Sequence, residues 1–429
     1  MTETVLLVGG GGREHAIARA LADDCDLYAC ASNRNPGIAA LADGFRSAEE
    51  RDADAILTYA EEIGADLAVV GPEAALEAGV ADELDDAGVY TFGPRAAEAR
   101  LETDKAYQRR FMREESIPGC PDFETFEDAD AAAEYVESVD DDVAVKPAGL
   151  TGGKGVRVTG DQVTHEEAAA YVRGADHDEW VVEERLVGEE FTVQAFVANG
   201  EFRVTPAIQD HKRAYEGDEG PNTGGMGSYS DTGRTLPFMI DADYDDAVAV
   251  LEAVVEALPD YKGVLYGQFM LGADGPRVVE FNARFGDPEA MNTLPVLTTP
   301  FLDVLTAARD GDALPELSFS GEATVCKYAV PAGYPTDPEA GARISVDVNE
   351  DDEGALLFYA SVDERDDGLY TTTSRSFAVV GRGDSIAAAE EQAEAALEGV
   401  DEGFHVRHDI GTADLVQRRV DHMAELRGE

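Results

Sequence analysis

Residues 146–155 read Lys146-Pro-Ala-Gly-Leu-Thr-Gly-Gly-Lys-Gly155, and this glycine-rich stretch carries most of the information about the fold. A P-loop must lead into a helix, but here a glycine follows Lys154 and the next residues, Val156-Arg-Val158, favour a strand. A glycine-rich turn between two antiparallel strands can fold over a triphosphate, whose charge the two ammonium groups would neutralise. We interpret the stretch as a phosphate-binding hairpin. The alternative is an ordinary hairpin with two solvent-facing lysines.

The scarcity of lysine argues against that alternative. The 429 residues include 89 Asp and Glu but only 33 Lys and Arg, which gives a formal net charge of −56. Two of the few lysines lie within nine positions of each other in this stretch. The lysines of the chain are Lys105, Lys146, Lys154, Lys212, Lys262 and Lys327.

The composition also excludes whole classes of function. Hydrophobic residues make up 44% of the chain, so its acidity is not that of a disordered tail without a core. A polyanion of this size is repelled by nucleic acid and by anionic membranes, so we expect neither as a partner. An acidic surface with few lysines suggests a halophilic protein that stays soluble in concentrated salt, where self-repulsion is screened.

The N-terminus and the cysteines indicate the compartment. The first apolar run, Val5–Val8, follows no basic segment and ends at a glycine, so it predicts a strand rather than a signal peptide. No run approaches the ~18 apolar residues of a membrane helix. The four cysteines lack CxxC spacing and lie in or beside apolar segments, which is typical of buried thiols in a reducing cytosol. We therefore expect a cytoplasmic protein.

The first hundred residues alternate between strand and helix patterns, and this order predicts a parallel, doubly wound sheet. The expected strands are Val5–Val8, Leu27–Ala31, Leu67–Val70 and Val89–Phe92. The expected helices are Glu14–Ala22, Asp54–Ile63 and Ala78–Ala87.

Beyond residue 100 the pattern changes. A helix is expected from about 101 to 115, antiparallel strands follow between about 143 and 210, and Asn199-Gly200 predicts a hairpin. A final region begins at the Pro/Gly-rich stretch 331–335, and its last clear helix is Ile386–Leu397. The other helix expected is Asp245–Ala257. The strands expected are Val143–Lys146, Gly155–Thr159, Trp180–Glu183, Phe191–Ala198, Glu201–Ile208, Gly267–Leu271, Arg277–Asn282, Gly354–Tyr359 and Ser376–Val380.

The loop Gly9-Gly-Gly-Gly-Arg-Glu-His15 lies between the first strand and the first helix. Backbone N–H groups at a helix N-terminus suit an anion, and glycine permits its close approach. A dinucleotide site would require G-x-G-x-x-G and an acid that ends the second strand, and both are absent here. We therefore expect this loop to bind the phosphate of a small substrate. The alternative is a purely structural turn.

The segment Val278–Glu289 predicts a metal and phosphate site. Alternate residues of a strand share a face, so Glu280, Asn282 and Arg284 should point the same way. Two oxygen ligands beside an arginine describe a Mg²⁺ site that bridges phosphates, and Gln268 on the preceding strand could supply a third oxygen. The alternative is a half-exposed polar face of the strand.

Two further segments are candidates. The long loop Asp210–Gly227 gathers His, Lys and Arg at its start, which would hold anionic substrate groups, whereas a flexible surface loop would be acidic in this chain. The segment Trp180–Thr192 places carboxylates just after a strand. Such a hinge could contact an adenine edge and a ribose diol, although an acidic loop is the simpler interpretation.

Taken in this order, the segments resemble the glycinamide ribonucleotide synthetases (phosphoribosylamine–glycine ligases), an ATP-grasp family of purine synthesis, over nearly the whole chain. The two matching motifs that begin at Gly220 and at Arg284 are highly specific. The motifs are Gly11-Gly-Arg-Glu-His15, Gly71-Pro-Glu73, Lys146–Gly155, Asp210-His-Lys-Arg213, Gly220-Pro-Asn-Thr-Gly-Gly-Met-Gly227 and Arg284-Phe-Gly-Asp-Pro-Glu289.

The resemblance implies a reaction and a multidomain α/β and α+β fold. ATP, glycine and 5-phosphoribosylamine would give ADP, phosphate and glycinamide ribonucleotide through glycyl phosphate, with no side-chain nucleophile. A Rossmann-like substrate domain would cover 1–102, and a two-lobed ATP-grasp domain with a mobile lid (about 118–190) would cover 103–325. A C-terminal α+β domain would cover 326–429. The protein would be a monomer or a homodimer whose partners are these small molecules.

The resemblance also implies roles for individual residues. Arg284, Lys154 and Asp287 would be catalytic, and Mg²⁺ or Mn²⁺ would be held by Gln268, Glu280 and Asn282. ATP would be bound by Lys105, Lys146, Gly152, Gly153, Lys154, Glu183, Glu184, Arg185, Leu186 and Glu190. Glycine and phosphoribosylamine would be bound by Gly11, Gly12, Glu73, Asp210, Lys212, Arg213, Asn222, Thr223, Gly224, Arg284, Asp287 and Glu289.

Three positions depart from the family pattern. Gly10 stands where asparagine is frequent, Pro147-Ala148 replaces Ala-Asp, and the neutral Gln268 stands where an acidic metal ligand can occur, which could re-tune a second metal. Two alternative functions are another ATP-grasp ligase and a nucleotide-binding sensor without turnover. The Asp210–Gly227 loop argues against the first, and the retained phosphate and metal residues argue against the second.

Salt should stabilise this protein. Screening of the acidic surface becomes strong at about 1 M salt, where the Debye length falls to about 3 Å. The thermal unfolding midpoint is therefore expected to rise between dilute buffer and molar KCl, as followed by circular dichroism. A midpoint that does not change with salt would contradict the halophilic interpretation.

Overall fold

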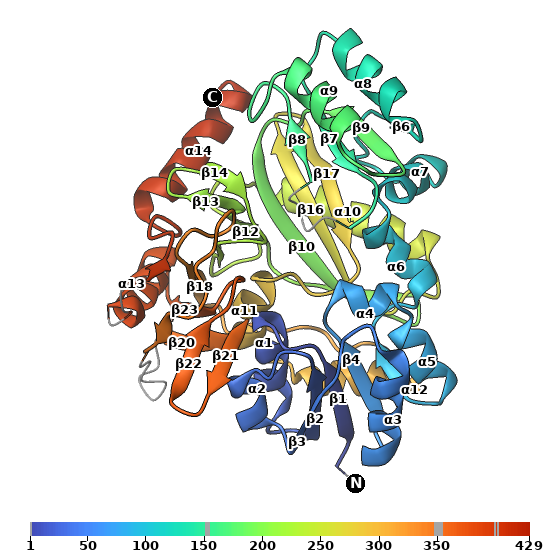
Figure 1. The fold of residues 1–429 in the computed structure, drawn as a ribbon, viewed down its shortest axis with the longest axis vertical. Helices are drawn as coiled ribbons and strands as arrows, with labels where there is room; N and C mark the ends of the chain where they lie inside the picture. The colour runs from blue at the N-terminus through green and yellow to red at the C-terminus, as the bar shows by residue number, and fades with distance from the viewer. Residues whose placement is uncertain (1, 151–154, 347–354, 399, 401–402) are drawn as a thin grey trace.

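A five-stranded parallel sheet forms the N-terminal part of the molecule (Figure 1). The computed structural model describes residues 2–150, 155–346, 355–398, 400 and 403–429, so the predicted site residues Gly152, Gly153 and Lys154 lie outside the described residues. The sheet order is β3-β2-β1-β4-β5 and all its neighbours are parallel, which confirms the doubly wound prediction. Its strands are β1 (Thr4–Val8), β2 (Asp26–Ala31), β3 (Gly44–Ser47), β4 (Leu67–Val70) and β5 (Tyr90–Phe92).

The central strand β1 has β2 on one side and β4 on the other, so the direction of winding switches beside it. Ligands of open α/β sheets bind at such a switch point, outside the carboxyl ends of the strands. The glycine-rich loop 9–12 leaves β1 at this end and leads into α1. The helices of this part are α1 (Gly12–Leu21), α2 (Pro36–Leu41), α3 (Ala53–Ile63), α4 (Glu73–Glu77) and α5 (Val80–Asp86).

The helix predicted over about 101–115 is wrong as a single element. Two helices, α6 (Ala96–Thr103) and α7 (Lys105–Glu114), meet at Asp104. The backbone of Asp104 is extended, and its carboxylate accepts the N–H of Tyr107 at 2.8 Å. An N-cap aspartate of this kind satisfies an orphan amide and starts a new helix.

A four-stranded antiparallel sheet lies at the opposite end of the molecule from the N-terminal sheet (Figure 1). Its core around the fully buried Trp180 is separate from the main core. This unit falls within the predicted lid. Its elements are β6 (Phe123–Phe126), α8 (Ala129–Ser138), β7 (Val143–Pro147), β8 (Arg157–Val158), α9 (His165–Gly174) and β9 (Trp180–Glu184).

A ten-stranded sheet runs through the middle of the molecule and into the C-terminal part, with the main path β17-β16-β10-β12-β15-β18-β23-β20. The predicted boundary between residues 325 and 326 falls inside β18, so the domain division stays a prediction. Its strands are β10 (Glu189–Ala198), β11 (Glu201–Val204), β12 (Ile208–Asp210), β15 (Gly227–Ser230), β16 (Gly263–Gly272), β17 (Gly275–Asn282), β18 (Ala323–Pro331), β20 (Ala355–Tyr359), β23 (Phe377–Gly383) and β24 (Phe404–His405).

The hairpin predicted at Asn199-Gly200 joins β10 to β11, and both residues have positive φ, 56° and 74°. The strand predicted over Glu201–Ile208 is divided into β11 and β12. Pro206 lies in the interruption, where it can donate no ladder hydrogen bond.

The prediction that Ile386–Leu397 is the last helix is wrong, because α14 (Ala413–Arg427) follows α13 (Ile386–Leu397). Only Leu415 and Met423 of α14 are buried, so its apolar pattern is weak. No helix among the described residues is both long and apolar enough to cross a membrane. The remaining elements are β13 (Arg213–Tyr215), β14 (Glu219–Asn222), α10 (Asp241–Ala257), α11 (Glu289–Thr293), a 3₁₀ turn (Leu294–Val296), α12 (Phe301–Asp310), β19 (Arg343–Ile344), β21 (Val362–Arg365) and β22 (Gly368–Thr371).

Candidate active site

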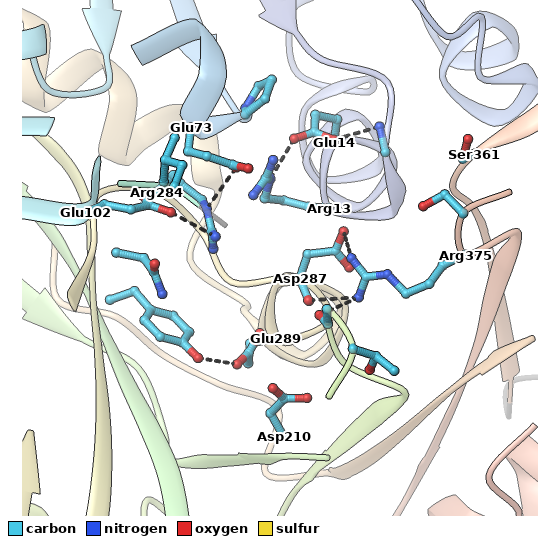
Figure 2. Close-up of a pocket in the computed structure, with 18 of the residues that line it drawn as sticks. Arg13, Glu14, Glu73, Glu102, Asp210, Arg284, Asp287, Glu289, Ser361 and Arg375 are labelled. Carbon is cyan, nitrogen blue, oxygen red and sulfur yellow. Dashed lines mark hydrogen bonds and ion pairs between the residues drawn. The ribbon is translucent and has the colours of Figure 1, made fainter. Parts of the chain in front are cut away.

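A cavity of about 490 Å³ opens where the N-terminal sheet, the ten-stranded sheet and the C-terminal part meet (Figure 2). It gathers residues that are far apart in the sequence, from Gly10 to Arg375. The predicted site residues that line it are Gly11, Glu73, Lys105, Asp210, Lys212, Thr223, Gly224, Glu280, Asn282, Arg284, Asp287 and Glu289.

Arg284 is held by carboxylates on one wall of the cavity. Its guanidinium lies 2.9 Å from Glu102 Oε1 and 3.5 Å from Glu73 Oε2. Glu102 also accepts the N–H of Ala283 at 2.8 Å. Burial raises the pKa of Glu102 to about 7, against the pull of Arg284. For Arg284 the carboxylates outweigh burial and raise its pKa, so the guanidinium stays charged and fixed in place.

Lys212 and Glu280 face each other on the adjoining wall. The Nζ of Lys212 lies 3.5 Å from Glu280 Oε1 and donates to Oε1 of Gln268, the residue paired with Glu280 across β16 and β17. Burial alone would raise the pKa of Glu280, but Lys212, Lys105 and Lys146 outweigh it and hold that pKa at about 2. Glu280 therefore stays ionised well below neutral pH.

The donor set on β17 fits a divalent cation in part. Glu280 and Asn282 line the cavity and offer hard oxygen ligands, and Mg²⁺ commonly takes one or two protein oxygens together with substrate phosphates and waters. Gln268 is less suited to be a ligand of this cation. Its oxygen is taken by Lys212, its amide donates to Glu190 at 2.6 Å, and it does not line the cavity. In the part of the chain that the structure describes, no three His, Cys, Asp or Glu side chains form a metal cluster.

A buried ion triad lies behind this wall. Glu183 on β9 pairs with Arg109 of α7 at 2.7 Å and with Lys146 of β7, and these three side chains are at most 8% exposed. Arg109 and Lys146 also donate to the carbonyl of Val279 at 2.7 and 3.2 Å. Burial lowers the pKa of Lys146, and Glu183 opposes that shift. The carboxylate of Glu183 thus points at two cations inside the protein rather than into open space.

The other predicted nucleotide residues lie between the end of β9 and the start of β10, and none of them lines the cavity. Glu184 accepts the N–H of Asp122 at 2.8 Å, and Arg185 lies 3.1 Å from Asp142. Leu186 lies in the same connection, and Glu190 is bound by Gln268. The structure brings these residues together along one segment without placing them on the cavity wall.

Three predicted substrate residues also lie off the cavity wall. Gly12 is buried at the start of α1, where a Cβ would lie 2.5 Å from the hydroxyl of Tyr328. Arg213 and Asn222 line a second hollow of about 430 Å³, which Val156, Arg157, Gln162 and Val163 of the predicted lid also line. The guanidinium of Arg213 donates to the carbonyl of Gly220 at 2.7 Å and pairs with Asp161.

Two carboxyl groups lie at the base of the cavity (Figure 2). Glu289 accepts the hydroxyl of Tyr266 at 2.8 Å, and Asp210 Oδ1 has no hydrogen-bond partner among the described residues. Burial raises the pKa of both groups, and Glu289 raises that of Asp210 further. Such a pair favours a cationic ligand such as an ammonium group, which would relieve the repulsion.

Sequence reasoning missed Arg375, which enters the cavity opposite Arg284 with Asp287 between them (Figure 2). Its guanidinium lies 3.1 Å from Asp287 Oδ2 and donates to the carbonyls of Gly224 and Gly225 at 2.8 and 3.1 Å. It therefore ties two predicted substrate segments to the C-terminal part. No local signal in Ser374-Arg375-Ser376 marks it, since its partners are distant in sequence.

Other residues that line the cavity were not predicted from the sequence, although some of them belong to the family motifs. Glu14 accepts the N–H of Gly11 at 2.7 Å and the Nε of Arg13 at 2.6 Å, so one amide of the glycine-rich loop already has a carboxylate partner. The position of Arg13 and Glu14 inside the Gly11–His15 motif was the available signal. The residues missed are Gly10, Arg13, Glu14, Asn33, Glu50, Pro72, Glu102, Leu150, Tyr266, Tyr334, Ser361, Ser374 and Arg375.

Comparison with solved structures supports this architecture. The structure superposes on a crystal structure of phosphoribosylamine–glycine ligase from Thermotoga maritima with a TM-score of 0.80 and 28% identity, over 95% of this chain and 99% of that one. The biotin carboxylase domain of 2-oxoglutarate carboxylase from Hydrogenobacter thermophilus has the same fold, with a TM-score of 0.73, 16% identity and coverage of 100% and 96%.

Sequence comparisons identify the family. Models of phosphoribosylglycinamide synthetase match in order: the N domain over residues 3–102, the ATP-grasp (A) domain over 103–290 and the C domain over 324–413. Curated phosphoribosylamine–glycine ligases from Methanosarcina barkeri and Methanococcoides burtonii are 51% and 52% identical to this chain. The alignments cover 99% of this chain and 100% and 99% of those relatives. The chain therefore belongs to the phosphoribosylglycinamide synthetase family, within the ATP-grasp carbon–nitrogen ligases.

Proposed function

We propose that this chain joins glycine to 5-phosphoribosylamine in purine synthesis, forming glycinamide ribonucleotide, ADP and phosphate from ATP. One observation carries the proposal. A single cavity gathers the glycine-rich loop at Gly11, the cations Arg284 and Lys212, and the oxygen donors Glu280 and Asn282. This combination suits a reaction in which phosphate, carboxylate and amine groups must be held together.

ATP would lie along the lid side of the cavity. Lys105 donates to the carbonyl of Gly149 at 3.2 Å, so it adjoins the glycine-rich hairpin, and we assign Lys105, Lys146 and Lys154 with Gly152 and Gly153 to the phosphates. The connection from Glu184 to Leu186 would contact adenine, and Glu190 the ribose. Glu183 would act through Lys146, because its carboxylate is paired with that ammonium group.

A divalent cation, Mg²⁺ or Mn²⁺, would be held by Glu280 and Asn282. When bound, it would neutralise phosphate charge and orient the terminal phosphate. The lowered pKa of Glu280 supports the assignment, because a carboxyl group must be deprotonated to bind a metal ion. Gln268 would help by orienting Lys212 rather than by serving as a metal ligand.

The chemistry would proceed in two displacements. A carboxylate oxygen of glycine attacks the γ-phosphorus, the bond to the β–γ bridging oxygen breaks, and ADP leaves with that electron pair. The amine nitrogen of phosphoribosylamine then attacks the acyl carbon of glycyl phosphate, loses a proton and expels phosphate. The protein contributes position and charge rather than a nucleophile, and Arg284 with Lys154 would stabilise the acyl phosphate.

The substrates would occupy the remaining walls. Gly11 on the cavity wall, with Lys212 and Glu73, would hold the phosphoribosyl group and the glycine carboxylate, and the buried Gly12 would support Gly11 from the first turn of α1. Asp287, Glu289 and Asp210 would face the amino groups, because an ammonium group would relieve the repulsion between the neighbouring carboxyl groups of Asp210 and Glu289. The other residues that we assign to substrates lie on the 210–227 loop. Thr223 and Gly224 line this cavity, whereas Arg213 and Asn222 line the second hollow.

We also propose that the protein acts in the cytoplasm, as a monomer or homodimer with small-molecule partners. All four cysteines are free thiols, and three of them are buried. Thiols that stay unpaired are typical of a reducing compartment.

An assay of ADP release tests the proposed function. With ATP and Mg²⁺, repeated turnover to ADP should require both glycine and phosphoribosylamine, because glycine alone supports only the first displacement and the amine must then consume the acyl phosphate. Each substrate is omitted in turn, and product formation is followed by mass spectrometry. ADP formation that depends on neither substrate would contradict the ligase assignment.

Replacement of Arg284 by alanine should abolish turnover without loss of ATP binding. Removal of one charge-stabilising donor lowers kcat by about 10²–10³-fold, whereas the ATP phosphates are assigned to the lysines. The Kd for ATP, measured by calorimetry, should therefore stay close to that of the wild type. Arg309→Ala is a control, since Arg309 is partly buried and pairs with Glu3 far from the cavity. Substantial activity in Arg284→Ala would remove Arg284 from the catalytic set.

The stability that Glu280 confers should depend on pH. Its pKa is about 2 in the folded protein against an ordinary value of 4.5, so its ionised form stabilises the fold above about pH 4.5, by about 3 kcal/mol. This contribution is lost as the pH falls from 4.5 towards 2. The difference in unfolding free energy between wild type and Glu280→Gln, measured by urea in metal-free protein, should shrink over that range. The exposed Glu391→Gln is the control, and a difference independent of pH would contradict the assigned ion pairing.

A further inference from the structure

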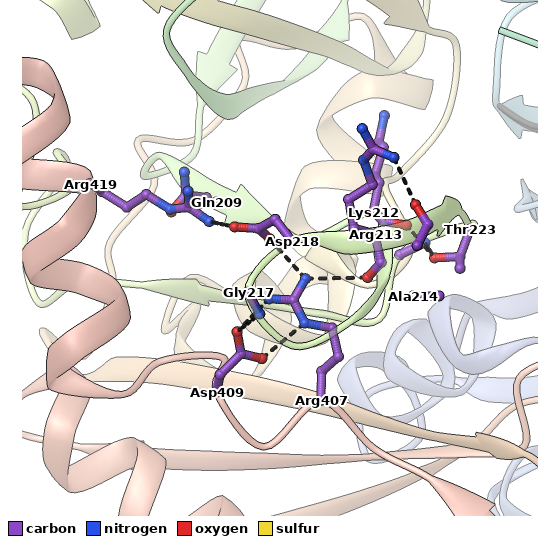
Figure 3. A network of polar contacts seen from close by, with 12 residues as sticks. Gln209, Lys212, Arg213, Ala214, Gly217, Asp218, Thr223, Arg407, Asp409 and Arg419 are labelled. Atoms are coloured by element: carbon purple, nitrogen blue, oxygen red, sulfur yellow. Dashed lines mark hydrogen bonds and ion pairs between the residues drawn. The ribbon is translucent and has the colours of Figure 1, made fainter. Parts of the chain in front are cut away.

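Three alternate residues of the C-terminal part, His405, Arg407 and Asp409, hold the backbone of the hairpin β13–β14. Figure 3 shows the contacts of Arg407 and Asp409. The Nε2 of His405 lies 2.7 Å from the carbonyl of Ala214. Arg407 donates to the carbonyl of Arg213 at 3.2 Å, and Asp409 accepts the N–H of Gly217 at 2.9 Å. Residues 405, 407 and 409 thus bind the backbone of one strand and of the hairpin tip.

Arg407 is the centre of these contacts. It is fully buried, and its guanidinium lies 2.7 Å from Asp409 Oδ2 and 2.8 Å from Asp218 Oδ1. Asp218 lies at the hairpin tip with a positive φ of 61°, beside Gly217 at 74°. Aspartate adopts this conformation more often than most non-glycine residues, and contacts with its surroundings stabilise it further. The two ion pairs of Asp218 supply that stabilisation.

The network extends to the last helix. Arg419 of α14 pairs with Asp218 and lies 3.3 Å from Glu189 at the start of β10, which in turn contacts His422 at 2.6 Å. The hairpin tip is therefore clamped between α14 and the 405–409 segment. Charged groups buried in this way are costly to leave without partners, so the arrangement favours one position of the hairpin.

The opposite end of the hairpin faces the cavity. Thr223 donates its N–H and its hydroxyl to the carbonyl of Lys212 at 2.7 and 2.8 Å, and both residues line the cavity. Lys212 then reaches Glu280 and Gln268. The carbonyl that Arg407 binds belongs to Arg213, the residue directly after Lys212. A shift at this carbonyl would displace the ammonium group of Lys212 in the cavity.

We infer that Arg407 is a positioning residue for the ligation, because it fixes the β13–β14 hairpin so that Lys212 meets Glu280 in the cavity. The inference rests on the proposed function through the role of Lys212. Through Arg407, the C-terminal part would contribute to the reaction in addition to the contacts that Arg375 makes. The guanidinium of Arg213 is occupied by Gly220 and Asp161, so Lys212 is the cation that the hairpin presents to the cavity.

A double-mutant cycle tests the inference in the full-length protein. Arg407→Gln and Lys212→Arg should each lower kcat/KM for glycine and phosphoribosylamine by about tenfold or more, since small misplacements are costly to positioned reactions. If Arg407 acts through Lys212, the double variant should be scarcely worse than the worse single variant. The KM for ATP should stay unchanged throughout, and Arg407→Lys should recover part of the activity. Effects that multiply in the double variant, or wild-type kinetics in Arg407→Gln, would overturn the inference.

Arg427→Gln is the matched control. Arg427 lies on α14, and its Nη2 donates to both carboxylate oxygens of Asp243 at 2.8 Å, but it contacts neither the hairpin nor the cavity. It should keep the kinetic constants of the wild type, whatever its effect on stability. Should Arg407→Gln fail to fold, Asp409→Asn takes its place, since it keeps the side-chain shape and an acceptor for Gly217 while removing the charge.

Hydrogen exchange separates this inference from the proposed function. Amides of residues 213–222 should exchange at least tenfold faster in Arg407→Gln than in the wild type, and unchanged exchange would overturn the inference even if the ligase activity is confirmed. A wild-type protein without ligase activity would instead refute the proposed function, whereas the exchange data would still show whether Arg407 holds the hairpin.

Discussion

A buried cation needs a carboxylate partner, and this constraint decides where the lysines of this chain lie. Four of the five lysines in the described residues form ion pairs inside the protein: Lys146 with Glu183, Lys212 with Glu280, Lys262 with Asp85, and Lys327 with Glu390 and Glu394. In a medium of low dielectric constant the loss of one partner costs about 3–5 kcal/mol. The first pair joins β7 to β9 within the four-stranded sheet, and the second joins the residue before β13 to β17. The third joins α5 to the segment before β16, and the last joins β18 to α13.

The same constraint explains how a polyanion with a net charge of −56 can bind phosphates. The exposed surface carries the excess of Asp and Glu, whereas Lys212, Arg284 and Arg375 are fixed at the cavity by carboxylates of their own. Each cation keeps its charge, because the neighbouring carboxylates outweigh the effect of burial on its pKa. The site can therefore present fixed cations to small phosphates, although the chain as a whole carries a large excess of negative charge.

Sequence patterns predicted the parts of the site that depend on local geometry. Glu280, Asn282 and Arg284 alternate along one strand, and all three line the cavity. The prediction was weaker where two elements meet. The break at Asp104 depends on one capping hydrogen bond, and α14 buries only two apolar residues, so neither gives a strong periodic signal. Glu102 and Arg375 could not be found from the sequence, because their partners are distant along the chain.

The sequence by itself determined the strand and helix order of the N-terminal sheet, the family and the segments that carry the chemistry, because these follow from local periodicity and specific motifs. Only the tertiary structure decided which charged groups meet. It turned Glu183 inward between Arg109 and Lys146, engaged Gln268 with Lys212, and brought Arg407 against the hairpin of Lys212. The physical reason is that the partner of a buried charge is chosen by distance in space, which sequence spacing does not encode.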